Sequence, residues 1–80
     1  MTTPQEIKAW LEAGLPGASI HVVGDGAHFE AIIVSELFVG NNTLSRHRMV
    51  YAALGDHMHS DIHALSMQTL TPEEQQAKEQ

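Results

Sequence analysis

The side chains with the most evident chemical potential are histidines, and they are unevenly spread. Four of the six histidines lie in SRHRMVYAALGDHMHSDIHALSMQTLTPEE, residues 45–74, and the chain contains no cysteine. A metal site would therefore need imidazole or carboxylate ligands, and disulfides and thiolate nucleophiles are excluded. His57-x-His59 has a chelating spacing, but residues two apart on a helix point about 200° from each other. We interpret both as helix-end residues that complement the helix dipole, unless the helix has already ended at Met58.

The other candidate metal ligands are His63, His28 and His21. His63 opens a predicted strand on the same side as Leu65 and Met67, so it is either a ligand or a histidine at the edge of the core. His28 directly follows the glycine-rich segment GDGA, beside which a side chain can reach a partner. His21 lies across the same predicted hairpin. Periodicity alone favours surface-strand histidines over ligands at these last two positions.

The charge balance bears on partners. Ten acidic and four basic side chains give a formal net charge of −6, whereas nucleic-acid binding usually needs a basic excess. Arg46 and Arg48 are two residues apart, so on a helix they do not share a face and form a weak phosphate clamp. The GDG segment at 24–26 precedes a strand and lacks the spacing of a phosphate loop, and no Gly-x-Ser-x-Gly occurs. We therefore predict that the protein is not an enzyme.

Local signals predict a helix followed by a β-hairpin. Thr3 is a suitable N-cap, Glu6 completes a capping box, and Gly14 ends the helix. Two runs of alternating apolar residues follow, at 19–23 and 28–34, separated by the turn residues GDG.

A second helix, a third strand and a last helix complete the predicted chain. The second helix follows GNN, with Thr43 or Ser45 as its cap, and its apolar face continues through His57 and Met58 before the helix frays around HMHSD. The third strand is IHALSMQTL, residues 62–70. A second Thr-Pro-x-Glu capping box at Thr71 starts the last helix, and we expect residues 77–80 to fray.

These elements predict one α+β domain over residues 1–80, with a core at about 5–76. The order is αββαβα, and the helix between the second and third strands favours a parallel return. We therefore expect a three-stranded mixed sheet with helices on one face. The N-terminus lacks the features of a signal peptide, and no run approaches the ~20 apolar residues of a membrane span. We expect a cytoplasmic protein with no membrane partner.

In this order the motifs resemble the BolA family, most closely its shorter acidic branch found in bacteria. The shared features are HF at the start of the second strand, F-x-G before the long helix, R-H-R-x-V-Y, the strand I-H-A-L, and T-P-E-E at the last helix. The resemblance covers essentially residues 5–76. It implies an αββαβα fold similar to a class II K-homology domain.

The resemblance also implies a partner and a cofactor. Members of the family pair with monothiol glutaredoxins and hold a bridging [2Fe-2S] cluster, for which the glutaredoxin brings a cysteine and a glutathione thiol. The histidine of the I-H-A-L strand, here His63, is then one ligand. The second comes from the loop before the second strand, and with no cysteine available we expect His28, with His21 in reserve. Whether the protein is a cluster carrier, an iron sensor or a stress regulator is left open.

Two other functions stay open at this point. Some family members resemble DNA-binding transcription regulators, and that function would use Arg46, His47, Arg48 and Lys78. The acidic balance counts against it, and the GXXG loop of K-homology domains is missing. The remaining alternative is a small metal-free interaction module. We expect the free protein to be a monomer.

Overall fold

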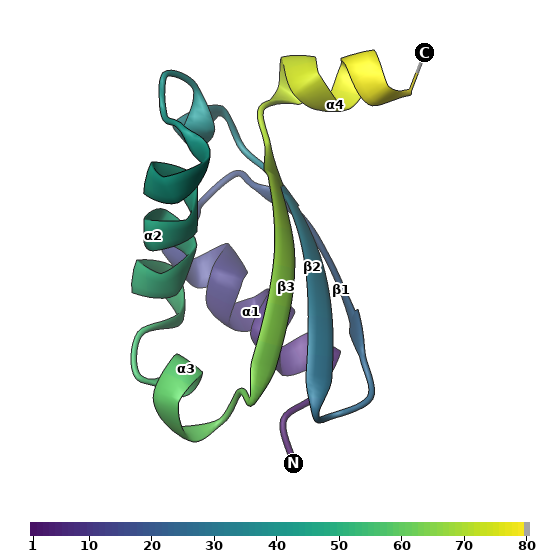
Figure 1. Ribbon diagram of the computed structural model, residues 1–80, viewed down its shortest axis with the longest axis vertical. Helices are drawn as coiled ribbons and strands as arrows, with labels where there is room; N and C mark the ends of the chain where they lie inside the picture. The colour runs from purple at the N-terminus through teal and green to yellow at the C-terminus, as the bar shows by residue number, and fades with distance from the viewer. Residues whose placement is uncertain (80) are drawn as a thin grey trace.

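The structure, a computed structural model that describes residues 1–79, has a sheet on one side and helices on the other (Figure 1). Its strands are β1 (Ser19–Gly24), β2 (His28–Val34) and β3 (Ala64–Leu70), in the spatial order β1-β2-β3. β1 is antiparallel to β2, and β3 is parallel to β2. The predicted α+β fold with a three-stranded mixed sheet is confirmed.

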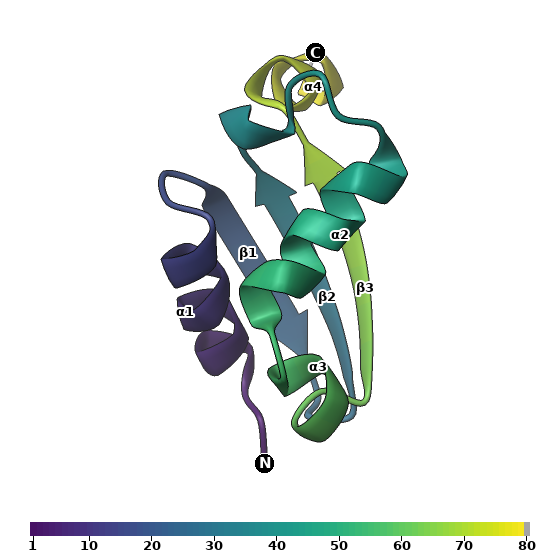
Figure 2. The same ribbon diagram turned by 90° about the vertical axis from the view of Figure 1, so that its left-hand side faces the viewer.

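Two long helices cover the same face of the sheet. α1 (Pro4–Gly14) lies over the β1 side and α2 (Thr43–Leu54) over the β3 side (Figure 2). α4 (Pro72–Lys78) instead projects from the end of β3, beyond the sheet (Figure 1). The expectation that helices lie on one face therefore holds for α1 and α2. No helix within residues 1–79 is long and apolar enough to cross a membrane.

Alternation along the strands builds the core. In β2, Phe29, Ala31 and Ile33 are buried and the residues between them are mostly exposed. Successive side chains in a strand point to opposite faces, so one face of the sheet is apolar and packs on the helices. Helical side chains such as Ile7 and Val50 complete this core.

The connection between α2 and β3 differs from the prediction. α2 ends at Leu54 because Gly55 has φ +56°, a left-handed conformation that glycine adopts readily. His57 and Met58 consequently belong to a separate short helix, α3 (His57–Ser60), and do not extend the face of α2.

Two helix ends also differ from expectation. The N-cap of α2 is Asn42, whose side chain accepts a hydrogen bond from the backbone N–H of Ser45, so neither Thr43 nor Ser45 is the cap. α4 continues to Lys78, so it includes part of the tail that was expected to fray. Gln80 lies outside the described residues. A short 3-10 helix, η1 (Glu36–Phe38), was not predicted.

We predict that Gly14→Ala destabilises the fold although alanine normally favours helices. A Cβ at Gly14 would lie 2.5 Å from the Cβ of Ala53 and 2.8 Å from its Cα, so α1 and α2 would have to separate. Overpacking of this kind costs about 1–3 kcal/mol, more than the helix propensity gained. Urea unfolding of Gly14→Ala, alone and combined with Ala53→Gly, tests this. The second change should recover part of the loss; equal or greater stability of the single variant would contradict the close contact.

Candidate functional site

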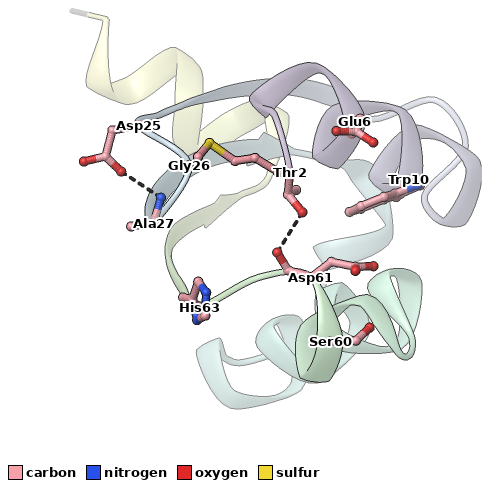
Figure 3. Close-up of a pocket in the computed structure, with 10 residues that line it drawn as sticks. Thr2, Glu6, Trp10, Asp25, Gly26, Ala27, Ser60, Asp61 and His63 are labelled. Carbon is pink, nitrogen blue, oxygen red and sulfur yellow. Dashed lines mark hydrogen bonds between the residues drawn. The ribbon is translucent and has the colours of Figure 1, made fainter.

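An open pocket of about 650 Å³ lies at the end of the sheet where β3 begins. Segments far apart in sequence line it: the N-terminus, α1, the β1–β2 loop and the α3–β3 connection (Figure 3). His63 is one of the lining residues, together with Trp10, Asp25 and Asp61. The pocket therefore places a histidine singled out from the sequence beside the β1–β2 loop.

His63 is exposed because it stands just before β3 rather than within it. The preceding residue, Ile62, is only 4% exposed and fixes the chain to the core. Asp61 is held from the other side, since its carbonyl oxygen accepts a hydrogen bond of 2.7 Å from the hydroxyl of Thr2. The backbone around His63 is thus fixed while the imidazole is accessible from outside. The structure therefore does not support the alternative that His63 is a histidine at the edge of the core.

Asp25 organises the loop that faces His63. One of its carboxylate oxygens accepts hydrogen bonds of 2.9 Å from the backbone N–H groups of both Ala27 and His28. These bonds, that of His28 first, hold the pKa of the Asp25 carboxyl below its ordinary value. Gly26 has φ +100°, so it takes up the sharp turn between them. The loop delivers His28 in a fixed position at the start of β2.

His28 and His63 lie at the same end of the sheet but on different sides of it. His28 is in register with Ala64, the residue that follows His63. The Nε2 of His28 is 3.4 Å from the hydroxyl of Ser66, which is on the face that the long helices leave uncovered. His63 lines the pocket beside α1. A ligand bound by both imidazoles would have to sit at the end of the sheet, where the two sides meet.

His21 lies elsewhere. It pairs with Ile32, four residues along β2 from His28. At about 3.4 Å per residue, this separates the positions of the two histidines by about 14 Å along the strands. The geometry therefore favours His28 over His21 as a companion of His63.

The histidines of α3 serve other contacts or none. His57 stacks on Trp10 with ring centroids 3.6 Å apart, and its Nδ1 is 2.5 Å from Oδ2 of Asp61. His59 is exposed. The contact between Trp10, His57 and Asp61, which joins α1 to α3, was not predicted from the sequence. Only the i, i+4 spacing of His57 and Asp61 could have indicated it.

The number of metal-ligating side chains that lie together limits which metal centre this chain could bind without a partner. Within residues 1–79, no three or more His, Cys, Asp or Glu side chains are grouped to hold a metal ion. His63 and His28 could provide part of a coordination shell, with imidazole nitrogens that iron accepts. The remaining ligands would have to come from a second molecule. Among the described residues, these two imidazoles therefore do not form a metal site on their own.

Arg46, a predicted nucleic-acid residue, is used inside the molecule. Its Nε donates to the carbonyl oxygen of Asn41 at 2.7 Å, and its Nη1 donates to the carbonyl oxygen of Thr69 at 3.0 Å. Nη1 also contacts a carboxylate oxygen of Glu74 at 2.7 Å, and the guanidinium lies over the ring of Phe38. The side chain is only 12% exposed. Arg46 therefore connects α2, β3 and α4 and offers little to a phosphate.

The other predicted nucleic-acid residues are scattered. Arg48 is exposed and His47 is half-buried on α2. Lys78 lies on α4 and donates to Oε1 of Gln68 at 3.1 Å. With Arg46 in internal contacts, the structure does not gather these side chains into one basic surface.

Acid is expected to weaken the attachment of α4. The hydrogen bond from Arg46 and that from the backbone N–H of Thr71 lower the pKa of Glu74. Because the folded pKa is depressed, the contribution to stability is present above the unfolded pKa, about 4.3, and is lost as the pH falls through the folded value. Thermal unfolding between pH 6 and 3 tests this against Glu74→Gln, which should lose less stability on acidification. Parallel pH profiles for the two proteins would contradict the assignment.

Comparisons with known proteins place this chain in a family. Residues 11–74 match the sequence profile of BolA-like proteins. The acid stress protein IbaG of Escherichia coli K12 is 39% identical over 70 residues, which covers 86% of this chain and 83% of the relative. A solved BolA protein homologue from Coxiella burnetii is 51% identical with a TM-score of 0.88, covering 95% of this chain and 99% of that one.

One relative differs in length. The DNA-binding transcriptional regulator BolA of Escherichia coli K12 is 39% identical over 51 residues, or 64% of this chain. The match covers 49% of the regulator, so the chain spans about half of that protein's length.

Proposed function

The chain belongs to the BolA-like family, and on this premise we propose that it binds a monothiol glutaredoxin and supplies histidine ligands to a [2Fe-2S] cluster shared between the two proteins. The observation that carries the proposal is the exposed His63, whose side chain lines the pocket beside the β1–β2 loop while its neighbours Asp61 and Ile62 hold the backbone. His28 stands at the end of that loop and is in register with Ala64, the residue that follows His63. The glutaredoxin would contribute its cysteine and a glutathione thiol.

Imidazole ligands would affect both the reduction potential of the cluster and the pH dependence of its binding. Replacing thiolate ligands of a [2Fe-2S] cluster with histidine removes negative charge and raises the reduction potential. The imidazole must be neutral to bind iron, so the binding of this chain to the shared cluster should weaken as the pH falls. The role of His63 is to bind, and the role of the surrounding chain is to hold its backbone while the ring stays accessible.

A titration tests the proposal and identifies the second ligand. The protein is added to a glutaredoxin that carries its cluster, and visible absorption and circular dichroism are recorded. We expect the wild-type protein to change the cluster spectrum. The spectrum obtained with His28→Ala should differ from that obtained with wild type, whereas His21→Ala should behave as wild type. An unchanged spectrum with wild type would contradict the proposal. A loss with His21→Ala but not with His28→Ala would reverse the assignment of the second ligand.

DNA binding is the second candidate, favoured by the name of the Escherichia coli regulator to which part of the chain is similar. On this chain it would rest on His47, Arg48 and Lys78, because Arg46 is held by Thr69 and Glu74. A fluorescence anisotropy titration with duplex DNA at several salt concentrations distinguishes it. Binding that falls steeply with salt and is lost in Arg48→Ala would support DNA recognition.

A further inference from the structure

The short helix α3 cannot hold its position by helix stability alone. It is four residues long, no side chain caps its N-terminus, and none of its residues is buried. Isolated helices shorter than about 12 residues are marginal in water. Because α2 ends before Gly55, α3 is not a continuation of a longer helix either. Contacts with the rest of the molecule must therefore set where α3 lies.

His57, the first residue of α3, provides such a contact with α1. Its imidazole stacks on the indole of Trp10, with the ring centroids 3.6 Å apart and the ring planes within 6° of parallel. Trp10 is itself anchored, because it packs against the hydrophobic core, and Met58 adds an apolar contact from α3 to the same core. Stacked rings stabilise beyond the area that they bury. The stack therefore attaches α3 to α1.

The same histidine also holds the chain that leads to His63. The carbonyl oxygen of His57 accepts hydrogen bonds from the backbone N–H groups of Asp61 and Ile62, at 2.9 and 3.0 Å. Its Nδ1 lies 2.5 Å from Oδ2 of Asp61. An ionised carboxylate can only accept a hydrogen bond, so Nδ1 carries the proton and donates it. Both the backbone and the side chain of His57 thus hold the two residues that precede His63.

These contacts form a continuous connection from α1 to His63. In the view of Figure 3, Asp61 lies between Trp10 and His63 on the wall of the pocket. The hydroxyl of Thr2 donates a hydrogen bond of 2.7 Å to the carbonyl oxygen of Asp61, so the connection is held from a second side. His63 is exposed, and packing around its ring does not fix it. The position of the imidazole therefore follows from the backbone that these contacts hold.

We propose that Trp10 and His57 are positioning residues for His63: their stack, continued by the hydrogen bond to Asp61, holds the α3–β3 connection so that the imidazole of His63 is presented in one place. Neither residue touches what His63 binds. The inference rests on the proposed function for the identity of that ligand, a [2Fe-2S] cluster brought by a glutaredoxin. A fixed ligand raises affinity because less conformational freedom is lost on binding.

Backbone ¹⁵N relaxation of the free protein tests the positioning without any cluster. We expect the amide of His63 to have an order parameter of about 0.85 in wild type, as in a rigid backbone, and below about 0.6 in His57→Ala. His59→Ala is the matched control, because His59 is an exposed histidine on the same helix, and it should behave as wild type. An order parameter at His63 that is the same in His57→Ala as in wild type would overturn the proposal.

Titration of a cluster-loaded monothiol glutaredoxin measures the consequence for ligation. Because His63 is intact in His57→Ala, we expect this variant to give the wild-type spectrum at saturation. Half-saturation should require about tenfold more protein, a factor that corresponds to the loss of one ring stack and one net hydrogen bond. His63→Ala should instead lose the spectral change at every concentration. Half-saturation of His57→Ala at the wild-type concentration would overturn the proposal.

Further variants separate positioning from general stability. His57→Phe keeps a flat ring for Trp10 but lacks Nδ1, so its half-saturation should lie between those of wild type and His57→Ala. Arg46→Ala is the control for stability, because Arg46 contacts the opposite end of β3 at Thr69. Below its unfolding transition it should half-saturate as wild type does. A loss of affinity in Arg46→Ala as large as that in His57→Ala would show general destabilisation and overturn the positioning role.

The outcomes separate this inference from the proposed function. A mobile His63 in His57→Ala, together with a cluster spectrum that wild type leaves unchanged, would support the positioning of His63 and contradict cluster ligation. A spectrum that wild type and His57→Ala change at the same concentration would support ligation and overturn positioning. Greater mobility of His63 and weaker half-saturation in the same variant would support both.

Discussion

Replacing His63 with alanine is expected to abolish the change that the wild-type protein produces in the spectrum of a glutaredoxin-bound [2Fe-2S] cluster. The side chain is exposed and makes no hydrogen bond within residues 1–79, so its removal should alter stability by no more than about 0.5 kcal/mol. The loss should therefore be one of ligation and not of folding. Visible circular dichroism of the mixture, with far-ultraviolet circular dichroism of the variant alone, measures both.

His59→Ala is the matched control for this prediction. His59 is also an exposed histidine, on α3 and four residues before His63. Its variant should reproduce the wild-type spectrum. If His63→Ala also reproduced it, the central ligand assignment would be wrong, and equal losses in both variants would point to a general effect of removing imidazoles.

The second large effect expected is on stability, at Arg46. Arg46→Ala removes charge-assisted hydrogen bonds to the carbonyl oxygens of Asn41 and Thr69 and separates α2 from α4. Hydrogen bonds that involve a charged group are worth about 1.5–3 kcal/mol, so we expect a loss of about 2–4 kcal/mol. For a domain of this size, this lowers the melting temperature by roughly 10 °C or more. Arg48→Ala should change the free energy of unfolding by less than about 0.5 kcal/mol.

This contrast affects any test of DNA binding. Loss of binding in Arg46→Ala would be expected from destabilisation alone, so Arg48→Ala is the informative variant. Urea unfolding of both variants decides the structural question. Similar, small losses in the two would show that the contacts of Arg46 do not hold the fold together.

Much of the fold follows from local signals in the sequence. The alternation in β1 and β2 predicted which residues are buried, and both Thr-Pro-x-Glu segments form the expected capping boxes at Thr3 and Thr71. The break between α2 and α3 was missed because the apolar periodicity continues across Gly55, whose left-handed conformation ends the helix. The Asn42 cap was missed because three polar residues in a row could each serve as a cap.

The site was predictable only in part, because its contacts join distant segments. The family resemblance drew attention to His63 and His28, and the parallel register of β2 and β3 places them at one end of the sheet. The internal role of Arg46 depends on Thr69 and Glu74, which lie 23 and 28 residues away. No spacing rule connects these positions. The stacking of His57 on Trp10 likewise depends on how α3 packs against α1.

The most direct test of the central claim is electron paramagnetic resonance of the reduced cluster in the complex. This chain is labelled with ¹⁵N-histidine and the glutaredoxin is unlabelled, so that nitrogen hyperfine couplings identify the source of any imidazole ligand. We predict strong ¹⁵N coupling from this chain with the wild-type protein, and in His63→Ala the loss of the coupling that His63 contributes, with only that of a second histidine ligand remaining. A complex whose cluster shows no ¹⁵N coupling would contradict the account, because the cluster would then be held without any histidine of this protein.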